Sequence, residues 1–206
     1  MIERESFSYD EVLESTKEYF NGDDLAASAV SSKYLFKNSN GEFVEKTPED
    51  MHRRLAKEFA RIELKFGGKR ALTEEQIYDS FKNFSKIIPQ GSPMYGIGNP
   101  YALVSLSNCV VVESPSDDVS SIMNRGKDLA NLFKRRCGVG IDVSTLRPEG
   151  ASVSNSAGTT TGAWSFADFY SYVCRMIGQN GRRGALMITM DVRHPDIEEF
   201  VTMKRD

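Results

Sequence analysis

The sequence has few cysteines, no long apolar run and no excess of positive charge. Its three cysteines, at positions 109, 137 and 174, are an odd number without paired spacing, so they cannot all pair within the chain. No stretch approaches the roughly 20 apolar residues of a membrane helix, and the charged N-terminus lacks the apolar core of a signal peptide. We therefore expect a reduced, cytoplasmic protein with no membrane partner.

The charge balance and the histidines exclude further classes of protein. The formal net charge of −3 gives no electrostatic basis for binding nucleic acid. Neither histidine, His52 or His194, neighbours a cysteine, so we expect no metal site. An apolar fraction of 40% and a charged fraction of 27% are ordinary for a soluble globular protein, and 206 residues allow one or two domains.

The first 90 residues carry repeated helix-start signals. Ser8 and Thr73 each begin a capping-box pattern, and Thr47 precedes a proline and two acids. These signals predict helices over residues 8–20, 25–36, 47–64 and 73–88. In the last of these, Pro89 should end the helix, and the apolar residues at helical spacing should form one buried stripe: Ile77, Phe81, Phe84 and Ile88.

The pattern changes after residue 90. Residues 90–100 are rich in glycine and proline and are predicted to form a loop at a domain boundary. Short apolar segments at 110–112, 139–143 and 186–190 then alternate with predicted helices at 119–136 and 163–177, which favours a largely parallel, buried sheet. We therefore expect a helical domain over residues 1–90 and an α/β domain over residues 91–206.

Cys109 is the first candidate for chemistry. A thiol beside a strand of valines is most often a small buried hydrophobic group, whereas disulfide exchange needs an accessible thiolate and a partner cysteine. No CxxC pattern supplies that partner locally. Gly138 and Gly140 resemble part of a dinucleotide fingerprint, but the third glycine and the strand–turn–helix context are missing, so we reject a Rossmann site.

Several charged residues allow two interpretations each. Arg182 and Arg183 lie between glycines just before a strand, where they suit a phosphate or form a solvated turn. Asp117 and Asp118 precede a helix and would ordinarily cap it. Arg147 lies in a turn and could form a surface ion pair.

Five motifs together are more specific than any one of them. Their order and spacing resemble those of ribonucleotide reductase large (catalytic) subunits: SNCVVV at 107–112, RCGVGID at 136–142, LRPEG at 146–150, QNGRRG at 179–184 and MDVRHPDIEEF at 190–200. The resemblance covers nearly the whole chain. It is closest to forms without an N-terminal ATP-cone, which are adenosylcobalamin-dependent or diferric-type.

The resemblance implies a fold and a set of site residues. The fold is a helical N-terminal domain followed by the first strands and helices of a ten-stranded α/β barrel, here incomplete. Cys109 resembles the first cysteine of a redox-active pair. The other matched positions fall at substrate-binding and effector-binding sites: Ser92, Asn108 and Gly138 for the substrate, and Asp117, Arg147, Gln179, Arg182 and Arg183 for the effector.

The resemblance also implies an activity. The family reduces ribonucleotides to deoxyribonucleotides for DNA synthesis, using a thiyl radical and a dithiol. The radical cysteine and the second reducing cysteine lie downstream in the family, so we expect this to be an N-terminal part that is inactive alone. The alternatives to this function are a deoxynucleotide-binding regulatory module and a non-functional truncated remnant.

The expected cofactors and partners follow from the same resemblance. This segment should bind no cofactor itself. The complete enzyme implies adenosylcobalamin or a radical-generating small subunit, with a thioredoxin-type reductant. The expected partners are a ribonucleotide substrate, a deoxynucleoside triphosphate effector, the missing C-terminal part of the subunit, and a second copy in a homodimer.

Overall fold

The computed structural model describes residues 6–177 and 184–205. The chain forms two compact units, which divide between Leu106 and Ser107. The domain boundary expected at residue 90 stays a prediction. None of the helices within the described residues is long and apolar enough to cross a membrane.

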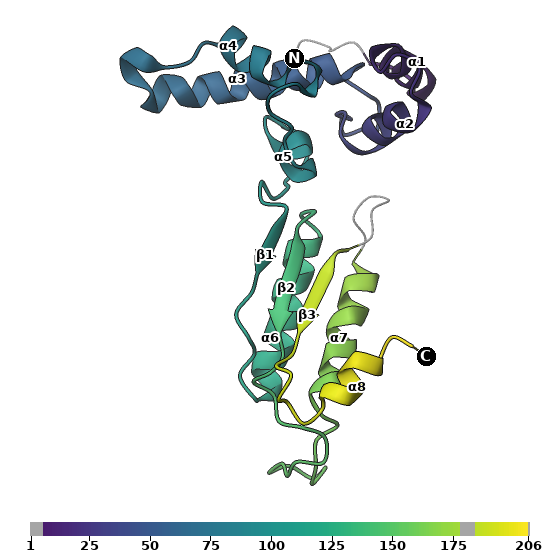
Figure 1. Ribbon diagram of the computed structural model, residues 1–206, viewed down its shortest axis with the longest axis vertical. Coiled ribbons are helices and arrows are strands. Elements are labelled where there is room, and N and C mark those ends of the chain that lie inside the picture. Colours follow the sequence, from purple (N-terminus) through teal and green to yellow (C-terminus); the bar gives the residue numbers. More distant parts are fainter. Residues whose placement is uncertain (1–5, 178–183, 206) are drawn as a thin grey trace. The chain divides into compact units, whose positions relative to one another are not determined.

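The first unit is helical (Figure 1). Its elements are α1 (Tyr9–Tyr19), α2 (Asp24–Lys33), α3 (Pro48–Phe66), a 3-10 turn η1 (Gly68–Arg70), α4 (Glu74–Phe81), a second 3-10 turn η2 (Lys82–Phe84) and α5 (Gly91–Gly96). The predicted starts are confirmed. The Ser8 and Thr73 hydroxyls each accept a backbone N–H three residues on, at 3.3 Å, and Asp50 accepts the backbone N–H of Thr47 at 3.0 Å.

The end of α4 differs from the prediction. The α-helix ends at Phe81, not at residue 88. Lys82 leaves the helix with a ψ of 131°, and Asn83 and Phe84 then adopt left-handed conformations with φ of 55° and 52°. Ile77 and Phe81 are buried as predicted, but Ile88 is 68% exposed. Only the first part of the predicted apolar stripe is therefore buried.

The predicted loop at residues 90–100 is also partly wrong, because it contains α5. Pro93 lies in the first turn of this helix, where its missing N–H removes no intrahelical hydrogen bond. Gly91 begins the helix against Tyr34, since a Cβ at Gly91 would lie 2.9 Å from that ring. Upstream, α2 ends at Lys33, earlier than residue 36.

The core of the helical unit contains an unusual histidine. His52 is fully buried on α3, stacked on Phe81 and edge-on to the ring of Phe84 at 4.5 Å between centroids. Neither ring nitrogen has a hydrogen-bond partner among the described residues. Burial, reinforced by the charge of Arg54, lowers the pKa of His52 to about 4. The imidazole is therefore neutral and packs as an apolar group.

The second unit is an α/β layer (Figure 1). Its elements are β1 (Cys109–Val111), α6 (Val119–Phe133), β2 (Gly138–Asp142), α7 (Ala163–Met176), β3 (Leu186–Thr189) and α8 (Ile197–Thr202). The strands lie in the order β1-β2-β3 and both pairs are parallel, which confirms the predicted pairing, although only one face of the sheet is buried. The helix before β2 ends at Phe133 and not at residue 136, because Arg136 itself takes a left-handed φ of 65°.

The two faces of this sheet differ in cover. Side chains alternate between faces along a strand. Val139 and Ile141 of β2 are buried in the core that α6 and α7 complete. On the opposite face, Val111 is 84% exposed and Met187 is 68% exposed. Cys109 is on this second face, which we call the open face.

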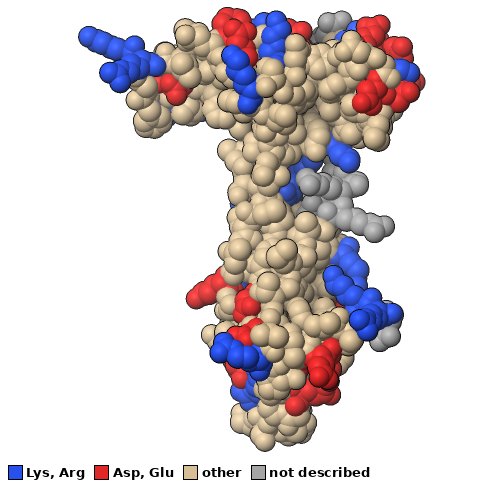
Figure 2. Space-filling model, in the orientation of Figure 1, with Lys and Arg blue, Asp and Glu red and all other residues tan. Residues whose placement is uncertain are grey.

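Charge is mixed on both units. Figure 2 shows acidic and basic side chains interspersed on each unit, and no continuous basic surface on the described part of the face in view. This distribution agrees with the formal net charge of −3.

Candidate functional site

Cys109 begins β1 at the amino-terminal end of the sheet, and its side chain is exposed. Its partner in the register is Gly138 on β2. A Cβ at Gly138 would lie 3.1 Å from the Cys109 Sγ, and the Gly138 N–H donates to the Asn108 carbonyl at 2.7 Å. Glycine at this position therefore leaves room for the thiol on the open face.

The other two cysteines have different surroundings. Cys137 is fully buried, and its thiol donates to the Gly138 carbonyl at 3.3 Å. Cys174 is partly buried on α7, and burial raises the pKa of its thiol. All three cysteines are free thiols, and Cys109 is the exposed one. Cys109 is therefore the most accessible of the three thiols, and access is one condition for disulfide exchange.

The three predicted substrate-binding residues come from both units. Asn108 and Gly138 flank Cys109 in the α/β unit, as described above. Ser92 lies in α5 of the helical unit, where it is fully buried. The roles of these residues stay predictions.

Asp117 and Arg147 meet beyond the carboxyl-terminal ends of β1 and β2. The Arg147 Nε donates to Asp117 Oδ2 at 2.6 Å, and the Arg147 backbone N–H donates to Asp117 Oδ1 at 3.2 Å. Arg147 Nη1 also donates to the Ser152 carbonyl at 2.7 Å. No partner for Nη2 occurs in the parts of the chain that the structure covers. Both Asp117 oxygens thus accept from Arg147, and one edge of the guanidinium stays accessible.

Asp118 has a different role from its neighbour. Its carboxylate accepts the Ser121 backbone N–H at 2.9 Å and caps α6. In the sequence both acids suited capping, and the resemblance placed Asp117 at the effector site. The structure separates them, because only Asp117 of the two pairs with Arg147.

Residues 150–162 form a loop that folds back on itself. Ser152 and Thr159 form an antiparallel bridge, and the backbones of Gly150 and Thr160 are hydrogen bonded at 3.0 Å. Gly150, at φ 76°, takes a conformation that side chains disfavour. The loop and the Asp117–Arg147 pair line an open cavity of about 230 Å³, whose polar lining includes Ser154, Asn155 and Thr160.

Two residues that sequence reasoning did not assign hold this loop in place. Asp196 is buried and accepts the backbone N–H of Glu149 at 3.0 Å and that of Ala163 at 2.9 Å. His194 is also buried, and its Nε2 lies 2.7 Å from the Leu146 carbonyl. Their partners are backbone groups, which leave no mark in the sequence. The only sequence signal for these two residues was their place in the MDVRHPDIEEF motif at 190–200.

A second carboxylate joins the strand ends. The Asp142 carboxylate at the end of β2 accepts the Thr189 hydroxyl at 2.7 Å and the Ser144 hydroxyl at 3.1 Å. The Asp191 backbone N–H donates to the Ser144 Oγ at 2.7 Å. Burial alone would raise the pKa of Asp142, but these hydrogen bonds outweigh it and lower the pKa. The carboxylate is therefore a fixed acceptor that ties β2 to β3.

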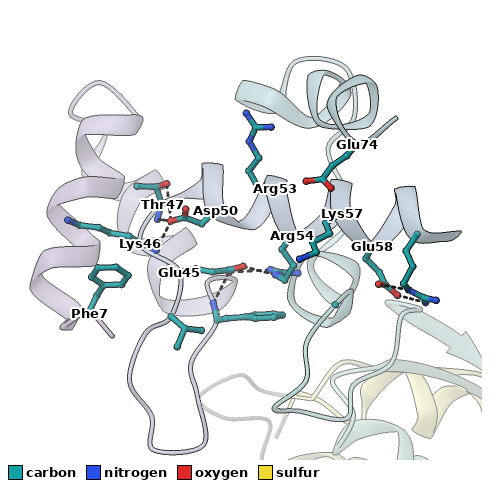
Figure 3. A pocket seen from close by; sticks show the side chains of 14 residues that line it. Phe7, Glu45, Lys46, Thr47, Asp50, Arg53, Arg54, Lys57, Glu58 and Glu74 are labelled. Carbon is teal, nitrogen blue, oxygen red and sulfur yellow. Dashed lines mark hydrogen bonds and ion pairs between the residues drawn. The ribbon is translucent and has the colours of Figure 1, made fainter. Parts of the chain in front are cut away.

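A larger cavity of about 890 Å³ lies in the helical unit, along α3 (Figure 3). Most charges around it are paired. Arg54 bonds Glu45 at 2.6 Å and Arg61 bonds Glu58 at 2.7 Å, while Asp50 caps α3. Its lining, as far as the structure describes it, contains no cysteine and no predicted site residue. Its chemistry is therefore that of a structural ion-pair network.

Both units match known protein families. Residues 107–206 match the family described as "Ribonucleotide reductase, barrel domain", and residues 20–99 match "Ribonucleotide reductase, all-alpha domain". The chain belongs to the ribonucleotide reductase large-subunit family. The expected fold, a helical region followed by the first part of the barrel, is thereby confirmed, and the three parallel strands are part of that barrel.

Curated relatives of this chain are much longer than it is. It is 30% identical over 182 residues to the vitamin B12-dependent ribonucleoside-diphosphate reductase of Mycobacterium tuberculosis (strain CDC 1551 / Oshkosh), covering 88% of this chain and 26% of that protein. It is 25% identical over 203 residues to the Dictyostelium discoideum ribonucleoside-diphosphate reductase large subunit, covering 95% and 22%. The chain thus spans about a quarter of the length of these relatives.

A solved structure supports the fold. The class Id ribonucleotide reductase alpha subunit of Actinobacillus ureae matches 85% of this chain and 29% of its own chain, with a TM-score of 0.63. The sequence identity is 17%, so the likeness concerns the fold alone.

Three predicted effector residues lie outside the described residues. These are Gln179, Arg182 and Arg183. The described effector candidates, Asp117 and Arg147, are in contact with each other, and the described thiol candidate, Cys109, is at the other end of β1. The sheet therefore carries two separate candidate sites.

Proposed function

We propose that this chain is the N-terminal part of the catalytic subunit of a ribonucleoside-diphosphate reductase, with Cys109 as one of its reducing thiols. The observation that carries the proposal is the environment of Cys109. Its exposed thiol stands on the open face of a reductase-family sheet, opposite a glycine that leaves it room. Asn108 and Gly138 beside it would contact the ribonucleotide, and the substrate role of Ser92 stays a prediction.

The proposed chemistry needs two thiols. Replacing the 2′-hydroxyl of a ribose by hydrogen releases water and consumes two electrons and two protons. Two thiols supply both by becoming one disulfide. Cys109 would be one of them, and the other would come from the remainder of the subunit. A thiyl radical on a third cysteine, also outside this chain, would start the reaction at the sugar.

The cysteines in this chain do not complete such a set. Cys137 is fully buried and is hydrogen bonded to the backbone beside it. Cys174 belongs to α7, and α7 covers the opposite face of the sheet from Cys109. We therefore expect the 206-residue chain alone to be inactive as a reductase.

The cavity beside Asp117 and Arg147 would receive part of a deoxynucleoside triphosphate effector. A guanidinium suits a phosphate, and a carboxylate accepts a sugar hydroxyl. The cavity volume of about 230 Å³ is below the roughly 300–1,000 Å³ of typical ligand pockets. Gln179, Arg182 and Arg183, or a second subunit, would therefore complete the site.

The complete enzyme would have further partners. Its radical source would be adenosylcobalamin or a radical-generating small subunit, since relatives include vitamin B12-dependent reductases and a class Id alpha subunit. No group of three or more potential metal ligands occurs among the described residues. We propose that a thioredoxin-type protein restores the dithiol, that the enzyme is a homodimer, and that it is cytoplasmic.

Reconstitution tests the proposal. The 206-residue chain is combined with a second polypeptide that carries the remaining barrel, including the radical and second reducing cysteines. With the radical source, a dithiol reductant and a ribonucleoside diphosphate, the mixture should form the deoxyribonucleotide, and neither polypeptide alone should do so. Turnover by the 206-residue chain alone would refute its expected inactivity. Turnover by the mixture that does not depend on Cys109 would refute the role of this cysteine.

A second candidate function is a deoxynucleotide-binding regulatory module without chemistry. The observation that favours it is that Asp117 and Arg147 are already paired within one chain. Calorimetry with each deoxynucleoside triphosphate distinguishes the two functions when it accompanies the reconstitution. Binding without turnover in the mixture would favour the regulatory module.

A further inference from the structure

Asp196 connects both ends of the loop at residues 150–162 to the segment after β3. One of its oxygens, Oδ1, accepts the Glu149 N–H at 3.0 Å, just before the loop. The other, Oδ2, accepts the Ala163 N–H at 2.9 Å, just after it. Asp196 is only 5% exposed, so water does not compete for these hydrogen bonds.

His194 adds a third attachment and fixes the direction of the bonds. The Asp196 backbone N–H can only donate, so it donates to the His194 Nδ1 at 3.1 Å. The other ring nitrogen, Nε2, then carries the proton and donates to the Leu146 carbonyl at 2.7 Å. Leu146 immediately precedes Arg147. The histidine thus holds the backbone beside the guanidinium that faces Asp117.

The carboxylate also replaces a missing helix cap. Gly162, the residue before α7, offers no side chain, and its φ of 88° turns the chain sharply into the helix. Asp196 takes the place of an N-cap residue from a distant part of the sequence, where a negative charge is favoured by the helix dipole. A Cβ at Gly162 would lie 2.7 Å from Asp196 Oδ2, so the glycine admits this approach.

We infer that Asp196 and His194 are positioning residues for the effector pocket and set its affinity for a deoxynucleoside triphosphate. This inference rests on the proposed effector role of Asp117 and Arg147. The two residues touch the backbone on both sides of the pocket, not the ligand. Because they lie on the connection that follows β3, they tie the backbone around the pocket to that connection.

The chain carries its own reporter of this clamp. Trp164, the one tryptophan of the sequence, lies in the first turn of α7 and donates its indole N–H to Glu149 Oε2 at 3.2 Å. Asp196 holds the backbone of the same glutamate. A ligand that moves the loop should therefore change the fluorescence of Trp164.

The test uses the full 206-residue chain with each of the four deoxynucleoside triphosphates, followed by Trp164 fluorescence and calorimetry. Asp196→Asn puts an amide NH₂ against a backbone N–H and loses one acceptor. We expect it to raise the Kd of the best-binding nucleotide by about tenfold or more, the effect of one lost charged hydrogen bond. Arg193→Gln is the matched control. It lies on the same connection but bonds only Asp191, at the surface, and should leave the Kd unchanged.

His194 separates positioning from folding. In His194→Gln the amide can still donate to Leu146 and accept from Asp196, so the affinity should be close to that of the wild type. His194→Leu loses both bonds and should weaken binding. A purely structural role would lower the melting temperature of these variants and leave the Kd of the folded protein unchanged, which would overturn the inference.

Two failures are distinguishable. Wild-type affinity and a wild-type fluorescence response in Asp196→Asn would overturn the clamp and leave the proposed function intact. Equal losses in Asp196→Asn and Arg193→Gln would also overturn it. If the wild-type chain binds none of the four nucleotides, either alone or mixed with the second polypeptide of the reconstitution, the effector role itself is wrong, and the inference falls with it.

Discussion

At the amino-terminal end of the sheet an exposed thiol faces a glycine, whereas at the carboxyl-terminal end almost every polar group has a partner. The Cys109 thiol is exposed and lies beside Gly138, where the missing side chain leaves it room. Beyond the other end, Arg147 bonds both Asp117 and a loop carbonyl, and Asp142 joins β2 to β3. The difference teaches that room matters at a reactive group, whereas prior orientation matters at a binding site.

The largest expected effect is at the thiol. In the reconstituted reductase, Cys109→Ser should lower reductant-coupled turnover by about 10³-fold or more, the scale of removing an essential reacting group. Nucleotide binding at the other end of the sheet should be unchanged. Cys174→Ser is the matched control and should keep turnover, since that thiol is partly buried on α7. Turnover rates and calorimetry measure both. Loss of nucleotide binding in Cys109→Ser would show that the two ends are not independent.

The next effect separates two neighbouring acids. Asp117→Ala should weaken deoxynucleoside triphosphate binding by about tenfold, because Arg147 loses the partner that orients it. It should barely change the free energy of unfolding, since the pair is about one-third exposed. Asp118→Ala should do the reverse and cost about 1 kcal/mol of stability as a lost helix cap. Calorimetry and urea unfolding test the pair, and equal effects on binding would contradict the separation.

The smallest effect concerns the glycines of β2. Gly138→Ala puts a Cβ 3.1 Å from the Cys109 Sγ, so it should displace the thiol and slow its reaction with an alkylating reagent severalfold, at a cost of about 1 kcal/mol in stability. Gly140→Ala puts its Cβ 3.4 Å from Val111, an ordinary contact, and should change the reactivity less. Alkylation rates followed by mass spectrometry compare the two. Equal rates would mean that Gly138 is not needed for access to the thiol.

The sequence predicted the beginnings of helices better than their ends. Caps are local, so Ser8, Thr47 and Thr73 could be read directly. Ends depend on single backbone conformations, such as those of Asn83, Phe84 and Arg136, which no composition rule anticipates. The parallel sheet was predictable because short apolar segments alternate with helices over the whole second half.

The candidate sites were predictable only in part. Motif order pointed to Cys109, Asp117 and Arg147, and the structure brings the last two together. The order of the motifs could not distinguish Asp117 from Asp118, because both acids follow the same turn and either could cap α6. It also gave no role to His194 or Asp196, which act on backbone groups almost 50 positions away in sequence.

The buried His52 has a consequence for the helical unit in mild acid. Its pKa of about 4 in the folded state is below its ordinary value of 6.5. Between these two pH values the imidazole is therefore protonated in the unfolded chain and neutral in the folded chain. The contribution of neutral His52 to the free energy of unfolding is fully present well above pH 6.5. It should fall by about 3 kcal/mol as the pH drops toward 4. His52→Phe, which keeps a ring between Phe81 and Phe84, should remove this dependence in urea unfolding at pH 7 and pH 5. A single neutral ring in an apolar core thus makes the folding of this unit an indicator of proton concentration.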